Sequence, residues 1–323
     1  MSINESEIIN SIGLGTAAIG RPQYINIKNK ADAEFSLENF KKKGLEILDQ
    51  AYQHGIRYFD TAPGYGLAEQ LLIDWKKEKE DSNIEMATKW GYTYVANFDP
   101  NAIQHEVKEH SLDKLNEQWE QSKNLFPFLT TYQIHSTTFE TGVLENKRIL
   151  NQLAELKQTY NLHIGLSTTG SNQSEVLKKA LDIEIEGQSL FNVFQVTYNV
   201  FDQSLFEISD RILKEEKRLV VKEALANGRI FPNDQYFNYK KAYIVLEELA
   251  QKYEVGIDSI GLRFCIDSIS PFKVLSGVTN ESHLLSNLQS LNFKLEDEDM
   301  IKLKKLAIQP AFYWNERKQL GWN

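Results

Sequence analysis

Residues 57–69 read Arg-Tyr-Phe-Asp-Thr-Ala-Pro-Gly-Tyr-Gly-Leu-Ala-Glu, and the organisation of the chain can be worked out from this stretch. A short aromatic run ends at the carboxylate of Asp60, which indicates a buried strand that reaches the protein surface. A proline and two glycines then predict a turn around Tyr65, and residues 68–79 predict a helix. A carboxylate at a strand end and a phenol on the loop above it form half of a candidate active site.

Apolar, strand-like segments alternate with helical patterns along the whole chain. The predicted strands are residues 12–16, 57–60, 84–88, 130–135, 162–166, 192–197, 219–222 and 272–276. The predicted helices are residues 37–54, 68–79, 102–124, 143–160, 172–181, 205–217, 235–253, 257–267, 280–291 and 296–307. Ser36 is expected to cap the first of these helices and Gly55 to end it. Strands that alternate with helices in this way predict parallel βαβ units.

Eight such units favour a closed barrel over an open, doubly wound sheet. We therefore expect an α/β fold, a (β/α)8 TIM barrel with extra helices and an aromatic C-terminal tail, with residues 1–323 as one domain. The rival is a Rossmann-type sheet, which needs Gly-x-Gly-x-x-Gly between the first strand and a helix. Here Gly13 and Gly15 are followed by Thr-Ala-Ala, and the predicted helix starts about twenty residues later. The chain therefore lacks the dinucleotide-binding fingerprint of a Rossmann-type sheet at this position.

Composition restricts the class of partner. The chain has 323 residues, 41% of them hydrophobic and 25% charged, and a formal net charge of −9 without a long basic run. We therefore expect no nucleic-acid partner and no membrane surface. The N-terminus lacks a signal-peptide pattern and no apolar run approaches the ~20 residues that span a bilayer, so we expect a cytoplasmic protein. The single cysteine, Cys265, lies in an apolar run and is expected to be a buried structural thiol.

Three ionisable residues stand at the ends of three consecutive predicted strands. Asp60 ends the second strand, Lys89 the third and His135 the fourth, with spacings of 29 and 46 residues that each fit one helix-and-strand unit. Because the carboxyl ends of barrel strands meet at one mouth, these side chains should converge there, with Tyr65 on the loop above. A helix cap or a structural histidine would explain any one of them alone, but not the coincidence of all four.

The residue types suggest an acid–base site. Tyrosine and lysine titrate near pH ~10 in isolation, so neither is an acid–base group at neutral pH without help. An ammonium beside the phenol should lower the pKa of Tyr65, and Asp60 should fix the position of Lys89. A neutral His135 can hydrogen-bond a substrate oxygen. Tyr65 could then protonate a carbonyl oxygen during reduction or deprotonate an alcohol during oxidation.

Over essentially its whole length the chain resembles the aldo-keto reductases, which are NAD(P)(H)-dependent barrel enzymes. The resemblance rests on Asp60-Thr-Ala with Tyr65-Gly and Glu69, on Thr-Lys89 and on Gln-Ile-His135, which match the family's Asp-Tyr-Lys-His tetrad in order and spacing. It implies that Tyr65 is the acid–base residue, that Lys89 and Asp60 tune it, and that His135 orients the substrate. No metal is expected.

The resemblance also implies a set of cofactor contacts. Ser167 and Gln195 would hold the nicotinamide carboxamide, and Thr168 replaces the usual asparagine beside them. Lys222 stands where some members stack an aromatic ring on the nicotinamide. The remaining implied contacts are the pyrophosphate loop Leu225, Asn227 and Gly228, and the adenosine segment Gly277, Thr279, His283 and Asn287. The family habit favours NADP(H) over NAD(H), but only narrowly, because Gly277 and His283 replace the Lys and Arg that commonly hold the 2′-phosphate in related enzymes.

The substrate is expected to be a small carbonyl compound or alcohol. By resemblance, loops and the C-terminal tail form its pocket, and Tyr24, Trp90, Trp314 and Trp322 are the candidate walls. The polar first loop, which begins at Arg21, is long enough to reach the same mouth and suggests a hydroxylated substrate such as an aldose. The direction of the reaction stays open. The alternative function is a regulatory or partner-binding barrel that binds the nucleotide with little turnover.

Overall fold

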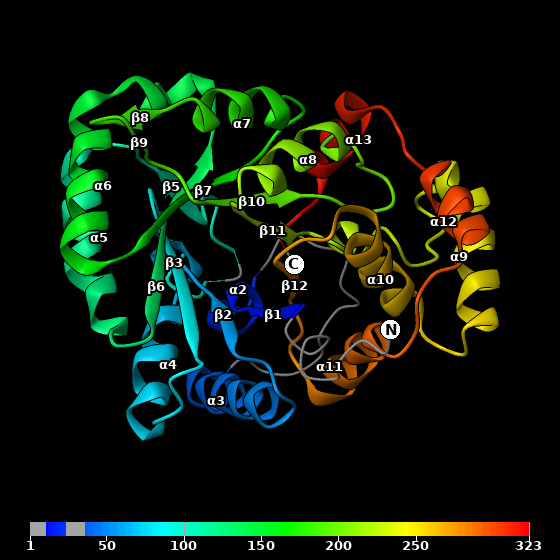
Figure 1. The fold of residues 1–323 in the computed structure, drawn as a ribbon. Helices are drawn as coiled ribbons and strands as arrows, with labels where there is room; N and C mark the ends of the chain where they lie inside the picture. The colour runs from blue at the N-terminus through cyan, green and yellow to red at the C-terminus, as the bar shows by residue number, and fades with distance from the viewer. Residues whose placement is uncertain (1–10, 24–35, 100, 323) are drawn as a thin grey trace.

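Eight parallel strands close into a barrel in the computed structural model, which describes residues 11–23, 36–99 and 101–322 (Figure 1). The barrel strands are β1 (Ile12–Gly15), β2 (Tyr58–Asp60), β3 (Glu85–Trp90), β6 (Leu129–Thr137), β7 (His163–Thr168), β10 (Val193–Thr197), β11 (Arg218–Lys222) and β12 (Lys273–Ser276). Their order around the barrel follows the chain, and β12 pairs with β1 to close it. The predicted (β/α)8 barrel is confirmed.

Helices surround this barrel and confirm most of the predicted helical segments. They are α2 (Ala17–Gly20), α3 (Leu37–Gln53), α4 (Ala68–Trp75), α5 (Leu112–Ser122), α6 (Lys147–Tyr160), α7 (Gln173–Leu181), α8 (Phe206–Lys214), α9 (Lys240–Lys252), α10 (Ile257–Ile269), α11 (Glu281–Leu288), α12 (Asp297–Lys304) and α13 (Pro310–Gln319). The Ser36 hydroxyl accepts from the backbone N–H of Asn39 at 3.4 Å, which is the expected cap of α3. Gly55 follows that helix with a φ of +87°, which suits a residue without a side chain.

The predicted helix at residues 102–124 is wrong in its first half. A two-stranded hairpin of β4 (Tyr92–Tyr94) and β5 (Glu106–Lys108) precedes α5 there, with Tyr92 paired to Lys108. The Ser111 hydroxyl accepts from the backbone N–H of Lys114 at 3.1 Å, so α5 begins only after this cap. The hairpin therefore stands over the carboxyl end of β3, where it can reach the mouth of the barrel.

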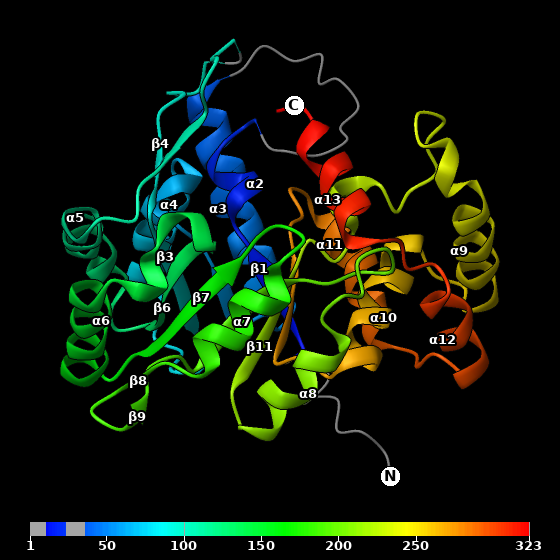
Figure 2. The same ribbon diagram turned by 90° about the horizontal axis from the view of Figure 1, so that it is seen from above.

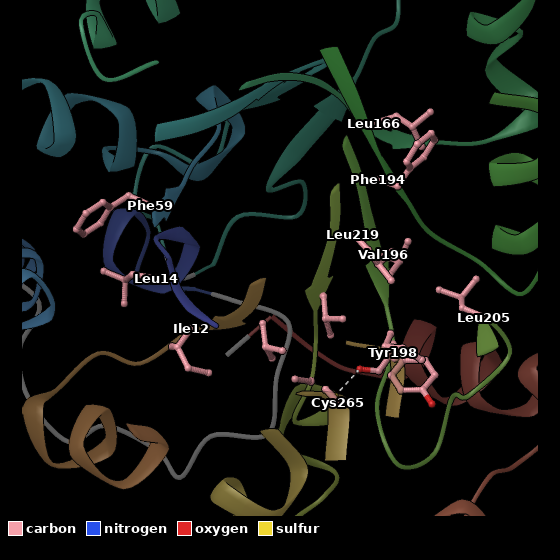
Figure 3. Packing of buried hydrophobic residues seen from close by; sticks show 14 of the residues in the cluster. Ile12, Leu14, Phe59, Leu166, Phe194, Val196, Tyr198, Leu205, Leu219 and Cys265 are labelled. Carbon is pink, nitrogen blue, oxygen red and sulfur yellow. Dashed lines mark hydrogen bonds between the residues drawn. The ribbon is translucent and has the colours of Figure 1, made fainter. Parts of the chain in front are cut away.

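Apolar side chains fill two layers. The larger layer lies between strands and helices and includes Leu14, Phe59, Leu166 and Phe194 (Figure 3). A smaller cluster of Tyr58, Ala87, Val193 and Val220 takes the alternate positions of four strands and fills the barrel itself. Cys265 belongs to the larger layer, where its thiol donates to the carbonyl of Tyr198 at 3.4 Å (Figure 3) and burial raises the pKa of that thiol. It is the structural thiol that the sequence predicted.

The C-terminal helix α13 lies toward the same end of the barrel as the β4–β5 hairpin (Figure 2). The Asn199 amide donates to the Tyr313 hydroxyl at 2.9 Å, and the Trp314 indole donates to Asp202 at 2.9 Å. These bonds tie the predicted aromatic tail to the loop that follows β10. Among the described residues, no helix has the length and apolar character needed to cross a bilayer.

Candidate active site

The pleat of the strands directs Asp60, Lys89 and His135 into the barrel. Asp60 and Lys89 lie two residues beyond the interior positions Tyr58 and Ala87, and His135 lies two residues beyond Gln133, whose amide reaches Asp60, so the three side chains project inward at the carboxyl end. The Lys89 ammonium donates to Asp60 Oδ1 at 2.5 Å and to the Thr61 carbonyl at 3.0 Å. Gln195 donates to the other carboxylate oxygen of Asp60 at 2.7 Å. The Thr61 carbonyl and the Gln195 amide therefore add a hydrogen bond to each partner of the buried ion pair.

Tyr65 approaches this pair from the loop after β2. Its hydroxyl lies 3.4 Å from Lys89 Nζ and 3.4 Å from His135 Nε2, and its ring meets the imidazole edge-on. The structure thus brings together all four side chains of the predicted tetrad. An ammonium and an imidazole beside one phenol oxygen form an arrangement that can pass a proton to a neighbouring oxygen atom.

Two glycines hold the tyrosine in place. A Cβ on Gly20 would lie 2.1 Å from the Tyr65 carbonyl oxygen, and a Cβ on Gly66 would lie 2.5 Å from the Gly20 carbonyl oxygen. Gly66 also has a φ of +63°, which disfavours other residues. The backbone N–H of Leu67 donates to the Gly20 carbonyl at 2.8 Å across the same contact. The segment after β1 therefore packs directly on the turn that carries Tyr65.

Burial dominates the electrostatics of the phenol and the imidazole. Burial, with the Asp60 carboxylate as second cause, raises the pKa of Tyr65 well above its usual value. The sequence-based expectation of a lowered pKa for Tyr65 is wrong, because burial outweighs the charges around the phenol and the Lys89 ammonium beside the hydroxyl does not reverse the direction. Burial and the Lys89 charge hold the pKa of His135 well below its usual value. At neutral pH the site therefore presents a neutral phenol and a neutral imidazole.

The β4–β5 hairpin supplies neighbours that the sequence analysis missed. The Tyr92 ring lies 4.7 Å from the imidazole of His135, and the Lys108 ammonium donates to the Ser136 carbonyl at 2.7 Å. Glu106, on the same hairpin, pairs with Arg21 at 2.8 Å. The alternation in residues 92–94 and 106–108 was the available signal, but it was assigned in part to a helix.

The residues expected around the nicotinamide divide into two groups. Ser167, Gln195 and Lys222 occupy inward positions at the carboxyl ends of their strands, and the Lys222 ammonium donates to the Thr197 hydroxyl at 2.7 Å. Thr168 is fully buried and contacts Gln173 Oε1 at 3.2 Å, since the pleat turns it away from the mouth. The first three side chains point toward the mouth, although Ser167 and Gln195 are almost fully buried beneath it, whereas Thr168 points to the outside of the barrel.

The expected adenosine segment lies at the end of β12. Gly277, Thr279 and His283 are exposed there, and a Cβ on Gly277 would meet nothing within 4 Å. Asn287 is buried instead, where its amide donates to Asp258 at 2.6 Å and accepts from Ser276 at 2.8 Å.

An exposed helix start beside open space suits the phosphate-bearing half of a nucleotide. Asn280 caps α11 by accepting from the backbone N–H of His283 at 2.8 Å. The expected pyrophosphate loop follows β11, where Leu225 is partly exposed and Asn227 and Gly228 have φ angles of +56° and +88°. The open helix start at α11 and the loop after β11 are therefore compatible with the nicotinamide cofactor that the sequence implies.

Of the expected pocket walls, one lies at the mouth with exposed surface. Trp322 is partly exposed and stacks on His105 at 4.5 Å. Trp90 has no exposed surface and packs against His110, because the residue after Lys89 points out of the barrel. Trp314 is also buried, behind Lys222. Tyr24 lies outside the described residues.

The fold and this site define a barrel oxidoreductase, and comparison with known proteins agrees. The sequence model of the Aldo/keto reductase family matches residues 11–308. The chain belongs to the aldo/keto reductase family, whose members are oxidoreductases that use nicotinamide cofactors.

Its relatives are distant in sequence but similar in length. The chain is 25% identical to the uncharacterised oxidoreductase YqkF of Bacillus subtilis, over 83% of this chain and 88% of that one. It is 22% identical to an NADH-specific methylglyoxal reductase of Escherichia coli, over 93% and 95% of the two chains. Among solved structures, the aldo-keto reductase AKR11C1 of Bacillus halodurans in its holo form superposes with a TM-score of 0.69 at 21% identity, over 93% and 92%. That similarity supports the fold alone.

Proposed function

We propose that the protein is an NAD(P)(H)-dependent reductase or dehydrogenase that acts on a small aldehyde or ketone and its alcohol, with an aldose as first candidate. The observation that carries this proposal is the convergence on one phenol oxygen. Tyr65 Oη lies 3.4 Å from both Lys89 Nζ and His135 Nε2. The cofactor would supply or accept the hydride, and the four side chains would handle the proton.

The proton is carried by Tyr65. During reduction the phenol donates its proton to the carbonyl oxygen of the substrate, and during oxidation the phenolate removes the proton of the alcohol. Lys89 stabilises the phenolate by charge and is itself held by Asp60. Neutral His135 orients the substrate oxygen by a hydrogen bond from its ring. Ser167, Gln195 and Lys222 line the mouth where the nicotinamide would lie.

The direct test is an absorbance screen of aldoses, methylglyoxal, other small aldehydes and ketones, and their alcohols, in both directions and with both cofactors. Methylglyoxal is included because a relative is named for its reduction. Tyr65→Phe is the control, because it removes the proton donor and leaves the ring. It should lower turnover by at least about a hundredfold and leave nucleotide affinity unchanged. Near-normal turnover in Tyr65→Phe would overturn the assignment. Nucleotide binding without turnover of any substrate would favour the regulatory barrel.

Cofactor choice is a finer step. We propose that NADP(H) binds more tightly than NAD(H) by no more than about tenfold, or roughly 1.4 kcal/mol. The margin is small because Gly277 offers no side chain to a 2′-phosphate and the exposed acid Glu281 stands beside Asn280 at the start of α11. Fluorescence titration with NADPH and NADH measures the ratio. Gly277→Lys should increase the preference for NADPH, and a strong NADH preference in the native chain would contradict the proposal.

A further inference from the structure

The guanidinium of Arg21 lies against the face of the tyrosine that the proposed mechanism uses. Its Cζ atom is 5.3 Å from the centroid of the Tyr65 ring. The side chain is 3% exposed and donates through Nη1 to the Gly64 carbonyl at 2.9 Å and to Glu106 at 2.8 Å. The indole of Trp322 contacts the same guanidinium at 4.7 Å. Arg21 is therefore fixed by three separate elements next to the phenol.

We propose that Arg21 is a positioning residue whose guanidinium, held by Glu106 over the Tyr65 ring, stabilises the phenolate that forms when Tyr65 transfers its proton. This inference rests on the proposed function, in which the Tyr65 proton passes to the substrate oxygen. A cation over an aromatic face interacts more strongly as the ring gains negative charge, so the contact favours phenolate over phenol. Lys89 acts at the hydroxyl end of the same residue, while Arg21 acts at the ring.

The packing of the loop makes this contact specific. Arg21 directly follows Gly20, and the missing side chains of Gly20 and Gly66 allow the two backbone segments to touch. A Cβ added to Gly66 would also lie 3.3 Å from the Cβ of Arg21. The backbone contact thus fixes where the Arg21 side chain begins, and the hydrogen bonds to Gly64 and Glu106 fix its guanidinium.

Charged groups of both signs lie near Tyr65, and together they affect the pKa of its phenol. Burial is the largest cause that raises the pKa of Tyr65; among the charges, Asp60, Glu106 and Glu223 raise it and Arg21 lowers it. Lys89 and His135 contact the hydroxyl directly. The positive charge of Arg21, beside the Tyr65 ring, opposes the effect of the three carboxylates on this pKa. Glu106 acts in two ways, since it fixes the guanidinium and also opposes its charge.

The two partners can therefore be tested by the direction in which the loss of each charge shifts the pKa of Tyr65. Arg21→Met removes the cation and should raise the apparent pKa of Tyr65 by about one unit, at the lower end of the range for a charge 4–6 Å away, because Glu106 offsets part of it. Glu106→Gln removes the negative charge but keeps an amide oxygen that can accept from the guanidinium, which Gly64 also holds, so it should lower the same pKa. A merely structural ion pair would behave differently, because loss of either partner would destabilise the fold in the same direction and leave the titration in place.

The titration is measured in two ways. Tyrosine labelled with ¹³C at Cζ reports ionisation by NMR, and the Tyr65→Phe spectrum identifies the Tyr65 signal without any substrate. The pH profile of kcat for alcohol oxidation should move the same way, with kcat of Arg21→Met about tenfold lower at neutral pH for a shift of one unit. Arg21→Lys should recover part of this loss, because it keeps the charge. The NMR readout stays valid even if the proposed reaction is wrong.

Arg57→Met is the matched control. Arg57 also places its guanidinium over a tyrosine ring, at 3.9 Å from Tyr52, and pairs with Asp81 at 2.7 Å. It should lose stability without moving the Tyr65 titration. The proposal is overturned if the titration is unmoved in Arg21→Met, or if both variants of the Arg21–Glu106 pair shift it the same way. A raised KM with unchanged kcat in Arg21→Met would also overturn it, because Arg21 would then contact the substrate.

Discussion

Replacing Lys89 by methionine tests whether the ion pair inside the barrel serves the fold, the chemistry or both. The Lys89 side chain is fully buried and that of Asp60 is 3% exposed, with 2.5 Å between their charged atoms. Lys89→Met keeps the length of the side chain and removes the charge. It leaves the Asp60 carboxylate without its cation in a site that water does not reach.

The magnitude follows from the remaining contacts of the carboxylate. Breaking a buried pair by removing one partner costs about 3–5 kcal/mol, because the other charge stays buried. Asp60 keeps its bond from Gln195 at 2.7 Å and a weaker one from Gln133 at 3.5 Å. We therefore expect the lower end, about 3 kcal/mol. The double variant Asp60→Asn/Lys89→Met removes both charges and should recover to within about 1 kcal/mol of the native chain, since no buried charge remains.

Chemical unfolding of the native chain and the single and double variants measures these differences, with NADPH or NADH binding as the check of native structure. Turnover should fall by orders of magnitude in Lys89→Met and should not return in the double variant, because the phenolate has lost the ammonium beside its oxygen. An unchanged unfolding free energy in Lys89→Met would refute the buried pair. Recovery of turnover together with stability would refute a chemical role for Lys89.

Two further substitutions test the surroundings of the tetrad. Burial raises the pKa of Glu69 to about 7, so its contribution to stability is full below the unfolded value near 4.5 and is lost as pH rises through 7. Glu69→Gln should remove this loss, and its unfolding free energy relative to the native chain should improve by about 3 kcal/mol between pH 4.5 and 7.5; a pH-independent difference would contradict the raised pKa. Gly66→Ala should cost about 3 kcal/mol and lower turnover, because its Cβ would collide with Gly20. Gly142→Ala is the control, with a similar φ of +62° but open space around it, and should cost about 1 kcal/mol.

The barrel and the tetrad were predictable because both depend on short-range pattern. A strand end marked by a charged residue can be recognised in sequence, and the barrel then brings Asp60, Lys89 and His135 to one mouth. The same alternation rule, applied one residue further, would also have placed Trp90 and Thr168 outside the barrel. Trp90 and Thr168 were assigned to the site because the inward–outward alternation of strand residues was not applied to them.

The surroundings of Tyr65 were harder to predict because they depend on contacts between distant segments. Glu106 lies on a hairpin whose strands are separated by eleven residues, 95–105, and its partner Arg21 is 85 residues away. Sequence spacing carries no information about such a pair. The raised pKa of Tyr65 was missed for a related reason, since residue types suggest which charges attract but not how completely the phenol is buried, and burial is the main cause of the raised pKa.

Asp60 and Tyr65 are held in different ways, and the difference predicts which substitutions affect stability and which affect turnover alone. Asp60 is bonded to side chains on β3, β6 and β10, so it holds four strands together at the centre of the barrel, and loss of Lys89 should disturb the fold and the reaction together. Tyr65 sits on a turn held by the contact of Gly20 with Gly66, and within the described residues its hydroxyl makes two long hydrogen bonds of 3.4 Å. Loss of that hydroxyl should therefore remove turnover at almost no cost in stability. Ionisation of Tyr65 during the reaction should therefore cost little folding stability, because the contacts of Asp60, and not those of the phenol, link the strands.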